Sequence, residues 1–304
     1  MYALQILVDA FSLGSLFALS ALGIGLVFGI MRLINFAYGE FITFGAYALV
    51  VPSSSLVAVK FIGNWPTPAM VAAIVTLVVA LALLTERVAF RPVRQANPAT
   101  LLISSFAVSY MLQHVILFVH SSRPKSVNIL PELTEPFVGL GLRIPIIDVV
   151  TIVAGAVMLA GIAGFLKLTS FGIQMRAAVE DFRMARLMGV RANTVVAVTF
   201  AITGVLAGIV SLLFVTKTGV LDYRMGLPLV LVAFVATVVG GMGSIFGPVL
   251  GGFILGFLSV VFQATLPEEL RPLRDAFVFF SVIVILLVRP QGLVRARSAS
   301  QERV

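Results

Sequence analysis

The sequence predicts an all-α protein, a polytopic bundle of transmembrane helices, and three observations lead to that fold class. Of the 304 residues, 60% are hydrophobic and only 11% are charged, whereas soluble domains have about 45–50% apolar and about 25% charged residues. Several apolar runs reach the roughly 20 residues that a helix needs to cross a bilayer. Glycines also recur at four-residue spacing, as in helices that pack closely within lipid. We therefore expect residues 1–304 to form one membrane domain.

Nine apolar segments are the expected spans. They cover residues 4–30, 37–59, 69–85, 99–119, 145–166, 195–215, 228–241, 246–264 and 276–288. The seventh and ninth are short for a full crossing, so we expect eight or nine spans, and a re-entrant segment near residues 228–264 is an alternative. The first basic residue is Arg32, whereas a signal peptide begins with a basic region. Residues 1–30 are therefore expected to be a retained first helix with an external N-terminus.

Basic residues in the connections predict the orientation. The connections after the third and fifth expected spans, the tail after the ninth, and Arg32 hold thirteen of the 21 Lys and Arg residues. Cytoplasmic loops carry the excess of Lys and Arg, so this side is expected to face the cytoplasm, with a periplasmic N-terminus and a cytoplasmic C-terminus. The net charge of +8 is explained in this way, and no nucleic acid is expected as a partner.

The glycine pattern indicates helix packing. The four pairs with GxxxG spacing are Gly25–Gly29, Gly204–Gly208, Gly247–Gly251 and Gly252–Gly256. Close helix packing is the favoured interpretation of each pair, and a ligand path lined by glycine is the alternative. The run from Gly240 to Ser244, followed by Pro248, contains three glycines in four residues and is expected to break a helix. Such a break is either a plain connecting turn or an unwound segment near a transport path.

The sequence offers this chain no energy source of its own. It has no cysteine and only two histidines, so no metal site is expected. Ion-coupled carriers keep ionisable groups within their spans, but here the only carboxylates near expected span ends are those of Asp9, Glu40 and Asp148. A P-loop needs a Gly-Lys pair, and none of the four lysines follows a glycine. If the protein pumps a solute, another subunit must hydrolyse the ATP.

The longest basic connection, at about residues 167–194, is the candidate contact with such a subunit. Residues 176–188 have helical spacing, with one stripe formed by Ala178, Phe182, Ala185 and Met188. Glu180 is placed to pair with Arg176 or Arg183 on a second stripe, and Gly189 is a natural helix stop. Such a helix either lies on the membrane surface or docks into a groove on a cytosolic partner.

Three segments resemble a known family. The loop residues Gly172, Arg176-Ala177-Ala178, Glu180-Asp181, Ala185 and Gly189-Val190 resemble the cytoplasmic coupling loop of branched-chain amino acid permeases of ABC transporters. Residues 29–40, Gly-Ile-Met-Arg-Leu-Ile-Asn-Phe-Ala-Tyr-Gly-Glu, resemble the signature of the H-type subunit, with Tyr38 where the family usually has His. The run from Gly240 to Ser244 and the ending Arg289-Pro-Gln-Gly-Leu293 also fit. The resemblance covers nearly the whole chain.

The resemblance implies an ABC importer membrane domain of the type II-like class in the bacterial inner membrane. It implies three kinds of partner besides membrane lipid: a second homologous permease, two cytosolic ATP-binding subunits and an extracytoplasmic solute-binding protein. The chain itself would bind no cofactor, because the ATP-binding subunits use the ATP. The residues implied in coupling to the ATPase are Arg176, Ala177, Glu180, Asp181, Ala185 and Gly189. Those implied in the family motif or path are Asn35, Phe36, Gly39, Glu40, Gly240, Gly241 and Gly243.

Several alternatives remain open at this point. Asn35 and Glu40 either line the path or cap and pin a bent helix end, and the second role is favoured because buried polar groups most often serve structure. The solute is expected to be a branched-chain or other hydrophobic amino acid, with urea or a short-chain amide as the alternative. A stand-alone channel or facilitator is a further alternative. An intramembrane enzyme built on Ser109 and His114 lacks a glycine elbow or paired carboxylates, so no catalytic residue is expected.

Overall fold

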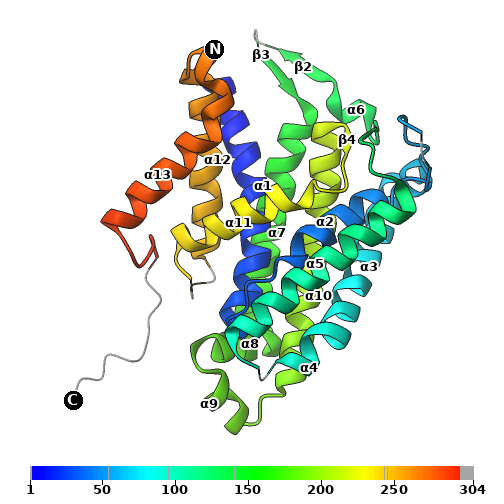
Figure 1. The fold of residues 1–304 in the computed structure, drawn as a ribbon. Coiled ribbons are helices and arrows are strands. Elements are labelled where there is room, and N and C mark those ends of the chain that lie inside the picture. Colours follow the sequence, from blue (N-terminus) through cyan, green and yellow to red (C-terminus); the bar gives the residue numbers. More distant parts are fainter. Residues whose placement is uncertain are drawn as a thin grey trace.

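The computed structural model describes residues 2–53, 55–94, 96–139, 142–242, 244 and 246–294, and it is a helical bundle (Figure 1). Within these ranges, six helical segments are long and apolar enough to cross a membrane. They are built on α1 (Tyr2–Met31), α3 (Thr67–Thr85), α5 (Pro98–His120), α7 (Ile146–Leu168), α10 (Ala192–Thr218) and α12 (Gly247–Thr265). The predicted all-α membrane fold is confirmed.

Three shorter helices complete the bundle: α2 (Ala37–Tyr47), α11 (Gly226–Gly240) and α13 (Arg274–Val288). They fall in the second, seventh and ninth expected spans, so the count of eight or nine spans is approximate. The prediction of a span over residues 37–59 is wrong in its second half, because the helix ends at Tyr47 and irregular chain follows. Pro52 and the serines after it explain the break, since proline removes a backbone donor and serine side chains compete for backbone hydrogen bonds.

The remaining elements are short. A π-helical turn η2 (Glu86–Phe90) and α4 (Arg91–Val93) extend α3, and η1 (Ile62–Asn64), α6 (Pro131–Thr134), α8 (Ser170–Glu180), α9 (Phe182–Leu187) and η3 (Glu268–Leu273) lie in connections. Two antiparallel strand pairs join β1 (Lys125–Ser126) to β4 (Val220–Leu221) and β2 (Pro136–Gly139) to β3 (Leu142–Pro145).

Helices α1 and α10 form the centre of the bundle. In the most apolar stretch of 18 residues, 83% of the residues are buried in the span built on α1 and 67% in that built on α10. The corresponding shares are 22%, 17% and 22% for the spans built on α3, α5 and α7. A helix that is hydrophobic on all sides lies in the core of a protein or faces lipid. The outer helices α3, α5 and α7 therefore leave apolar surface for lipid or for another subunit.

Two parts of the chain, from α1 to α3 and from α10 to α12, have the same order of helices but run in opposite directions. In Figure 1, α1 descends from the N-terminus whereas α10 ascends from α9, and each is followed by a short helix and a long one. Helix α1 packs against α11 and α12, and α10 packs against α2 and α3. Repeats of inverted topology are common in transporters, and their substrate sites lie where the two repeats meet. The short helices α2 and α11 contact each other at that place.

The glycine pairs lie where helices approach closely, as predicted. A Cβ atom at Gly204 of α10 would lie 2.8 Å from Cα of Val79 of α3, and one at Gly256 of α12 would overlap the backbone of Gly14 of α1. By contrast, a Cβ atom at Gly164 of α7 would meet nothing within 4 Å.

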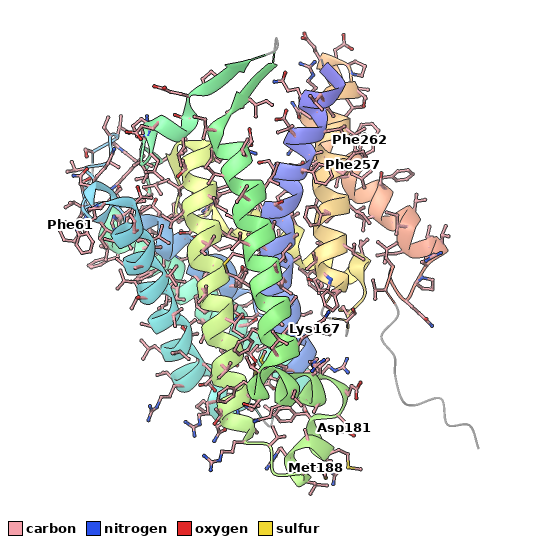
Figure 2. All side chains as sticks on the ribbon, turned by 180° about the vertical axis from the view of Figure 1, so that it is seen from behind. Phe61, Lys167, Asp181, Met188, Phe257 and Phe262 are labelled. Atoms are coloured by element: carbon pink, nitrogen blue, oxygen red, sulfur yellow. The ribbon has the colours of Figure 1, made fainter. Side chains whose placement is uncertain are left out.

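The two ends of the bundle differ. The hairpin β2–β3 and the N-terminus lie at one end, called here the upper end, and α8 and α9 lie at the other, the lower end (Figure 1). Viewed from behind, Phe61 lies toward the upper end, whereas Lys167, Asp181 and Met188 mark the lower end (Figure 2). The basic connections after the third and fifth expected spans both lie at the lower end, as the charge pattern predicts.

Candidate functional site

The segment between α1 and α2 is an unwound stretch held by polar contacts. Asn35 is fully buried, and its Oδ1 accepts a hydrogen bond from the backbone N of Ala37 at 3.1 Å. Glu40 is also buried, and one carboxylate oxygen accepts a hydrogen bond from Oγ of Ser109 on α5 at 3.2 Å. The first contact forms a local turn before α2, and the second fixes α2 to α5.

Helix α2 meets α11 through backbone. A Cβ atom at Gly39 would lie 2.7 Å from the carbonyl O of Gly226, so a side chain at position 39 would separate the helices. The backbone N of Gly226 donates a hydrogen bond to Oγ1 of Thr43 at 3.1 Å. Tyr38 lies fully buried against α1, where a Cβ atom at Gly23 would be 2.6 Å from its Oη. The missing side chain at Gly23 thus makes the space that the tyrosine fills.

Aromatic rings complete this crossing. Phe36 stacks on Phe106 of α5 with ring centroids 4.1 Å apart, and its centroid lies 6.2 Å from that of Phe234 on α11. The structure thus brings four of the predicted motif residues to the place where α2 meets α5 and α11: Asn35, Phe36, Gly39 and Glu40. No sequence pattern pointed to Gly226, which is an isolated glycine after a loop.

The predicted glycines Gly240 and Gly241 lie elsewhere, at the opposite end of α11. They form a tight turn, in which Gly241 has φ +111°. The chain end returns to this turn, because the backbone N of Leu293 donates to the carbonyl of Val239 and the backbone N of Val294 to that of Gly240, both at 2.9 Å. The two C-terminal segments that resemble the family therefore lie against each other. Gly243 lies outside the described residues.

The predicted coupling loop forms two helices rather than one. Helix α8 is capped by Thr169, whose Oγ1 accepts a hydrogen bond from the backbone N of Gly172 at 3.0 Å. At Asp181 the backbone leaves the helical conformation, and Oδ1 accepts hydrogen bonds from the backbone N atoms of Arg183 and Met184, both at 2.9 Å. The expectation of one helix over residues 176–188 is wrong because this side chain caps a new helix.

The loop residues divide into exposed and buried groups. Arg176, Ala177, Glu180, Asp181 and Gly189 are exposed, whereas Ala185 is buried. Of the predicted stripe, Ala178 faces the protein and is 2% exposed, whereas Met188 is 85% exposed. Among the described residues, no ion pair joins Glu180 to an arginine. Gly189 ends α9 with φ +88°, as its prediction as a helix stop requires.

A basic hollow lies beside this loop at the lower end. Its volume is about 870 Å³, and the residues that line it include Arg91, Arg94, Phe182, Arg186 and Arg191. Arg94 forms an ion pair with Glu86 and donates a hydrogen bond from Nη1 to Oδ1 of Asn193 at 2.9 Å. This contact links the connection after α3 to the start of α10. Sequence reasoning missed it, because the two partners lie 99 residues apart.

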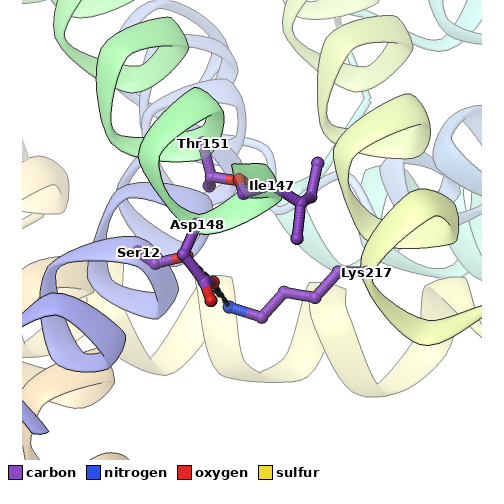
Figure 3. Close-up of polar contacts among 5 residues, drawn as sticks. All are labelled: Ser12, Ile147, Asp148, Thr151 and Lys217. Atoms are coloured by element: carbon purple, nitrogen blue, oxygen red, sulfur yellow. Dashed lines mark hydrogen bonds and ion pairs between the residues drawn. The ribbon is translucent and has the colours of Figure 1, made fainter. Parts of the chain in front are cut away.

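An ion cluster near the upper end ties three helices together (Figure 3). Lys217 of α10 donates from Nζ to Oδ1 of Asp148 of α7 at 2.6 Å and to Oγ of Ser12 of α1 at 2.9 Å. Oγ of Ser12 donates to the same carboxylate oxygen at 2.6 Å. The sequence placed Asp148 near a span end but did not link it to Lys217. The pair Ser109 and His114 is not assembled as a site, because Ser109 contacts Glu40 and the His114 ring contacts the carbonyl of Tyr110.

Comparison with known proteins gives a consistent result over nearly the whole chain. The family model described as "Branched-chain amino acid transport system / permease component" matches residues 6–288. The high-affinity branched-chain amino acid transport system permease protein BraD of Pseudomonas aeruginosa is 32% identical over 297 residues, which are 96% of this chain and 95% of the relative. The corresponding permease protein LivH of Escherichia coli K12 is 34% identical over 306 residues, covering 97% of this chain and 96% of the relative. No solved structure matches.

Proposed function

This chain belongs to the family of branched-chain amino acid transport permease components, and from that premise we propose that it forms part of a translocation path for branched-chain or other hydrophobic amino acids. The observation that carries the proposal is its similarity to BraD and LivH, which extends over almost the full length of both. A permease for urea or short-chain amides is the alternative within this kind of function.

The crossing of α2 and α11 supports a path at the centre of the bundle. Both helices are too short to cross a membrane, and they meet where the two inverted repeats pack together. In many transporters the substrate site lies near such discontinuous helices. Four motif residues would fix the position of α2 beside the path: Asn35, Phe36, Gly39 and Glu40. Gly240 and Gly241 would hold the turn between α11 and α12.

The lower end supports a mechanical connection to ATP-binding subunits. Helices α8 and α9 protrude from the bundle (Figure 1), and five of the six predicted coupling residues are exposed. A short exposed helix can fit a groove on a partner, and the adjacent basic hollow suits an acidic rim on that groove. The exposed coupling residues would face the partner: Arg176, Ala177, Glu180, Asp181 and Gly189. Ala185 would pack the segment onto the bundle.

The complete importer would contain three further kinds of component in the bacterial inner membrane and beside it. A second homologous permease would pack on this one within the lipid, and two cytosolic ATP-binding subunits would dock at the lower end. An extracytoplasmic solute-binding protein would dock at the upper end and deliver the amino acid. The N-terminus would be periplasmic and the C-terminus cytoplasmic, in agreement with the excess of Lys and Arg at the lower end.

The test is copurification and uptake with all components present. The double variant Arg176→Ala/Glu180→Ala should lose the ATP-binding subunits and ATP-dependent leucine uptake, while the permease keeps its thermal stability. The matched control is Glu268→Ala/Arg271→Ala, which removes an exposed pair of opposite charges, 3.6 Å apart, at the upper end. Uphill uptake by this chain alone in vesicles would overturn the proposal. Passive flux without ATP would identify a facilitator.

A further inference from the structure

A mostly apolar cavity opens beside α11, next to the crossing of the two repeats. Its volume is about 490 Å³, and α1, α10, α11, α12 and α13 all contribute to its wall. Phe17, Phe214, Leu231 and Val278 supply much of its apolar surface. Pro228 also lines it, only two residues after Gly226, so the cavity begins where α11 leaves α2.

Helix α13 creates this cavity because it diverges from the bundle. Figure 1 shows α13 descending away from α12 and α11. Near its start it is held to α12, since the ring centroids of Phe262 and Phe277 are 5.9 Å apart. Figure 2 shows Phe257 and Phe262 on the part of α12 that adjoins α13. The cavity therefore lies between helices, where α13 separates from α11 and α12, and is not formed by a loop.

A pair of opposite charges lies in the wall of this cavity, at the start of α13. Arg274 donates hydrogen bonds from Nε at 2.9 Å and from Nη2 at 2.7 Å, both to Oδ1 of Asp275. Among the described residues, neither Oδ2 of Asp275 nor Nη1 of Arg274 has a hydrogen-bond partner. The side chains are 37% and 69% exposed, so both charges are accessible at the cavity's rim. One rim thus offers a free anionic oxygen and a free cationic donor side by side.

This arrangement matches one class of solute. A free amino acid carries an ammonium and a carboxylate on one carbon atom, and an aliphatic side chain would extend from that carbon into the apolar interior. Pockets that bind small molecules are mostly apolar and carry a few polar groups that fix orientation. Urea and short amides carry no ionised groups that could pair with Arg274 and Asp275. They also have too little apolar surface to fill the apolar part of the cavity.

We propose that this cavity is an outer vestibule that binds a zwitterionic amino acid with an aliphatic side chain before it reaches the crossing of α2 and α11. Asp275 receives the ammonium group, Arg274 receives the carboxylate, and Phe17, Phe214 and Val278 contact the side chain. The inference rests on the proposed function and adds the residues that recognise the solute within the permease.

The absence of cysteine from the chain makes a direct test possible. Thr218 lines the cavity, so Thr218→Cys places a single thiol there, and the rate of its reaction with a charged maleimide is measured on the purified full chain. The control is Phe280→Cys, on α13 at a position that is 64% exposed and not part of the wall. Leucine should slow the reaction several-fold at position 218 and leave it unchanged at position 280.

Variants and analogues separate the two charges. Isopentylamine lacks the carboxylate and 4-methylpentanoate lacks the ammonium, so each should protect much less than leucine, and acetamide not at all. Arg274→Gln and Asp275→Asn should abolish protection, whereas Asp275→Glu should retain it. The pair Glu268→Gln/Arg271→Gln, with the same charges outside the wall, should have no effect. Unchanged reactivity of the thiol at position 280 shows that each variant is folded.

Besides a complete lack of protection by leucine, two results would overturn the inference. One is equal protection by leucine and by either single-charge analogue, and the other is protection that survives both Arg274→Gln and Asp275→Asn. The proposed function is judged separately, by ATP-dependent uptake in the complete importer. Amino acid uptake without protection at position 218 would reject the vestibule and keep the permease function, whereas uptake of amides alone would reject both.

Discussion

The ion cluster of Lys217, Asp148 and Ser12 allows a quantitative prediction about stability. Replacing Lys217 by Met removes the cation and leaves the Asp148 carboxylate with Ser12 as its remaining partner in the cluster. Asp148 is only 4% exposed, so water cannot easily replace the lost partner. The Lys217 side chain is 30% exposed, so the cation itself is less strongly desolvated than the carboxylate.

The magnitude follows from the 2.6 Å separation of Nζ and Oδ1. At an effective dielectric constant of about 20, the gross attraction is about 6 kcal/mol. Desolvation of the two ions offsets most of it, at several kcal/mol per ion. Removing one partner of a buried pair costs roughly 3–5 kcal/mol, because the other charge stays buried. The partial exposure of Lys217 places Lys217→Met near the lower limit, at about 3 kcal/mol.

The double variant Lys217→Met/Asp148→Leu should behave differently, because it leaves no unpaired charge. Replacing a buried pair by apolar residues is often neutral or stabilising, so we expect the double variant within about 1 kcal/mol of wild type. The assay is reversible unfolding in mixed micelles, with Lys167→Met as the control for an exposed lysine of α7. A double variant as unstable as Lys217→Met would refute the reasoning, as would a single variant as stable as wild type.

Three further predictions concern glycines and a second ion pair. Gly256→Ala should lower the free energy of unfolding by about 1–3 kcal/mol through overpacking, whereas Gly164→Ala, with open space around it, should be neutral or stabilising in the same denaturation assay. Gly189→Ala should cost about 1–2 kcal/mol because φ is +88°, and hydrogen exchange should report faster opening of α9. Arg94→Gln leaves the Glu86 carboxylate buried without its cation, so we expect a loss of roughly 3 kcal/mol, recovered in part when Glu86→Gln is added.

Each of these has a clear contrary outcome. Equal effects of alanine at positions 256 and 164 would mean that helix contact does not set the cost. Unchanged exchange in α9 after Gly189→Ala would show that the positive φ is not required there. If adding Glu86→Gln to Arg94→Gln lowers stability further, the unpaired carboxylate is not the source of the loss.

Local patterns predicted most of the helices and the close-packed glycines, because apolar runs and small-residue spacing act within one helix. The prediction for residues 37–59 failed beyond Tyr47, since Val57 and Val59 extend the apolar run while Pro52 prevents the helix from continuing through it. In the coupling loop, residues 176–188 were expected to form one helix with Asp181 inside it, whereas the Asp181 carboxylate caps a second helix, α9. The same residue type serves both roles, and spacing alone does not separate them.

Contacts between distant segments could not be predicted from the sequence. Lys217 and Asp148 lie 69 residues apart, and periodicity carries no information about which helix faces which. The same is true of the crossing at Gly39 and Gly226, where the observation that matters is the absence of a side chain on both helices. Within the candidate site, the motif from Asn35 to Glu40 was identified through a resemblance, and its partners on α5 and α11 came only from the fold.

The contact of Gly39 with Gly226 has a mechanical consequence. Helices that interlock through large side chains have a preferred crossing angle, because ridges on one fill grooves on the other. Two glycine backbones offer no ridges, so this contact sets the separation of α2 and α11 without interlocking side chains. The hydrogen bond from Gly226 to Thr43 opposes sliding. The two short helices are thus held at a set distance by backbone contact, and the ring contact of Phe36 with Phe234 adds the side-chain packing that the glycines lack.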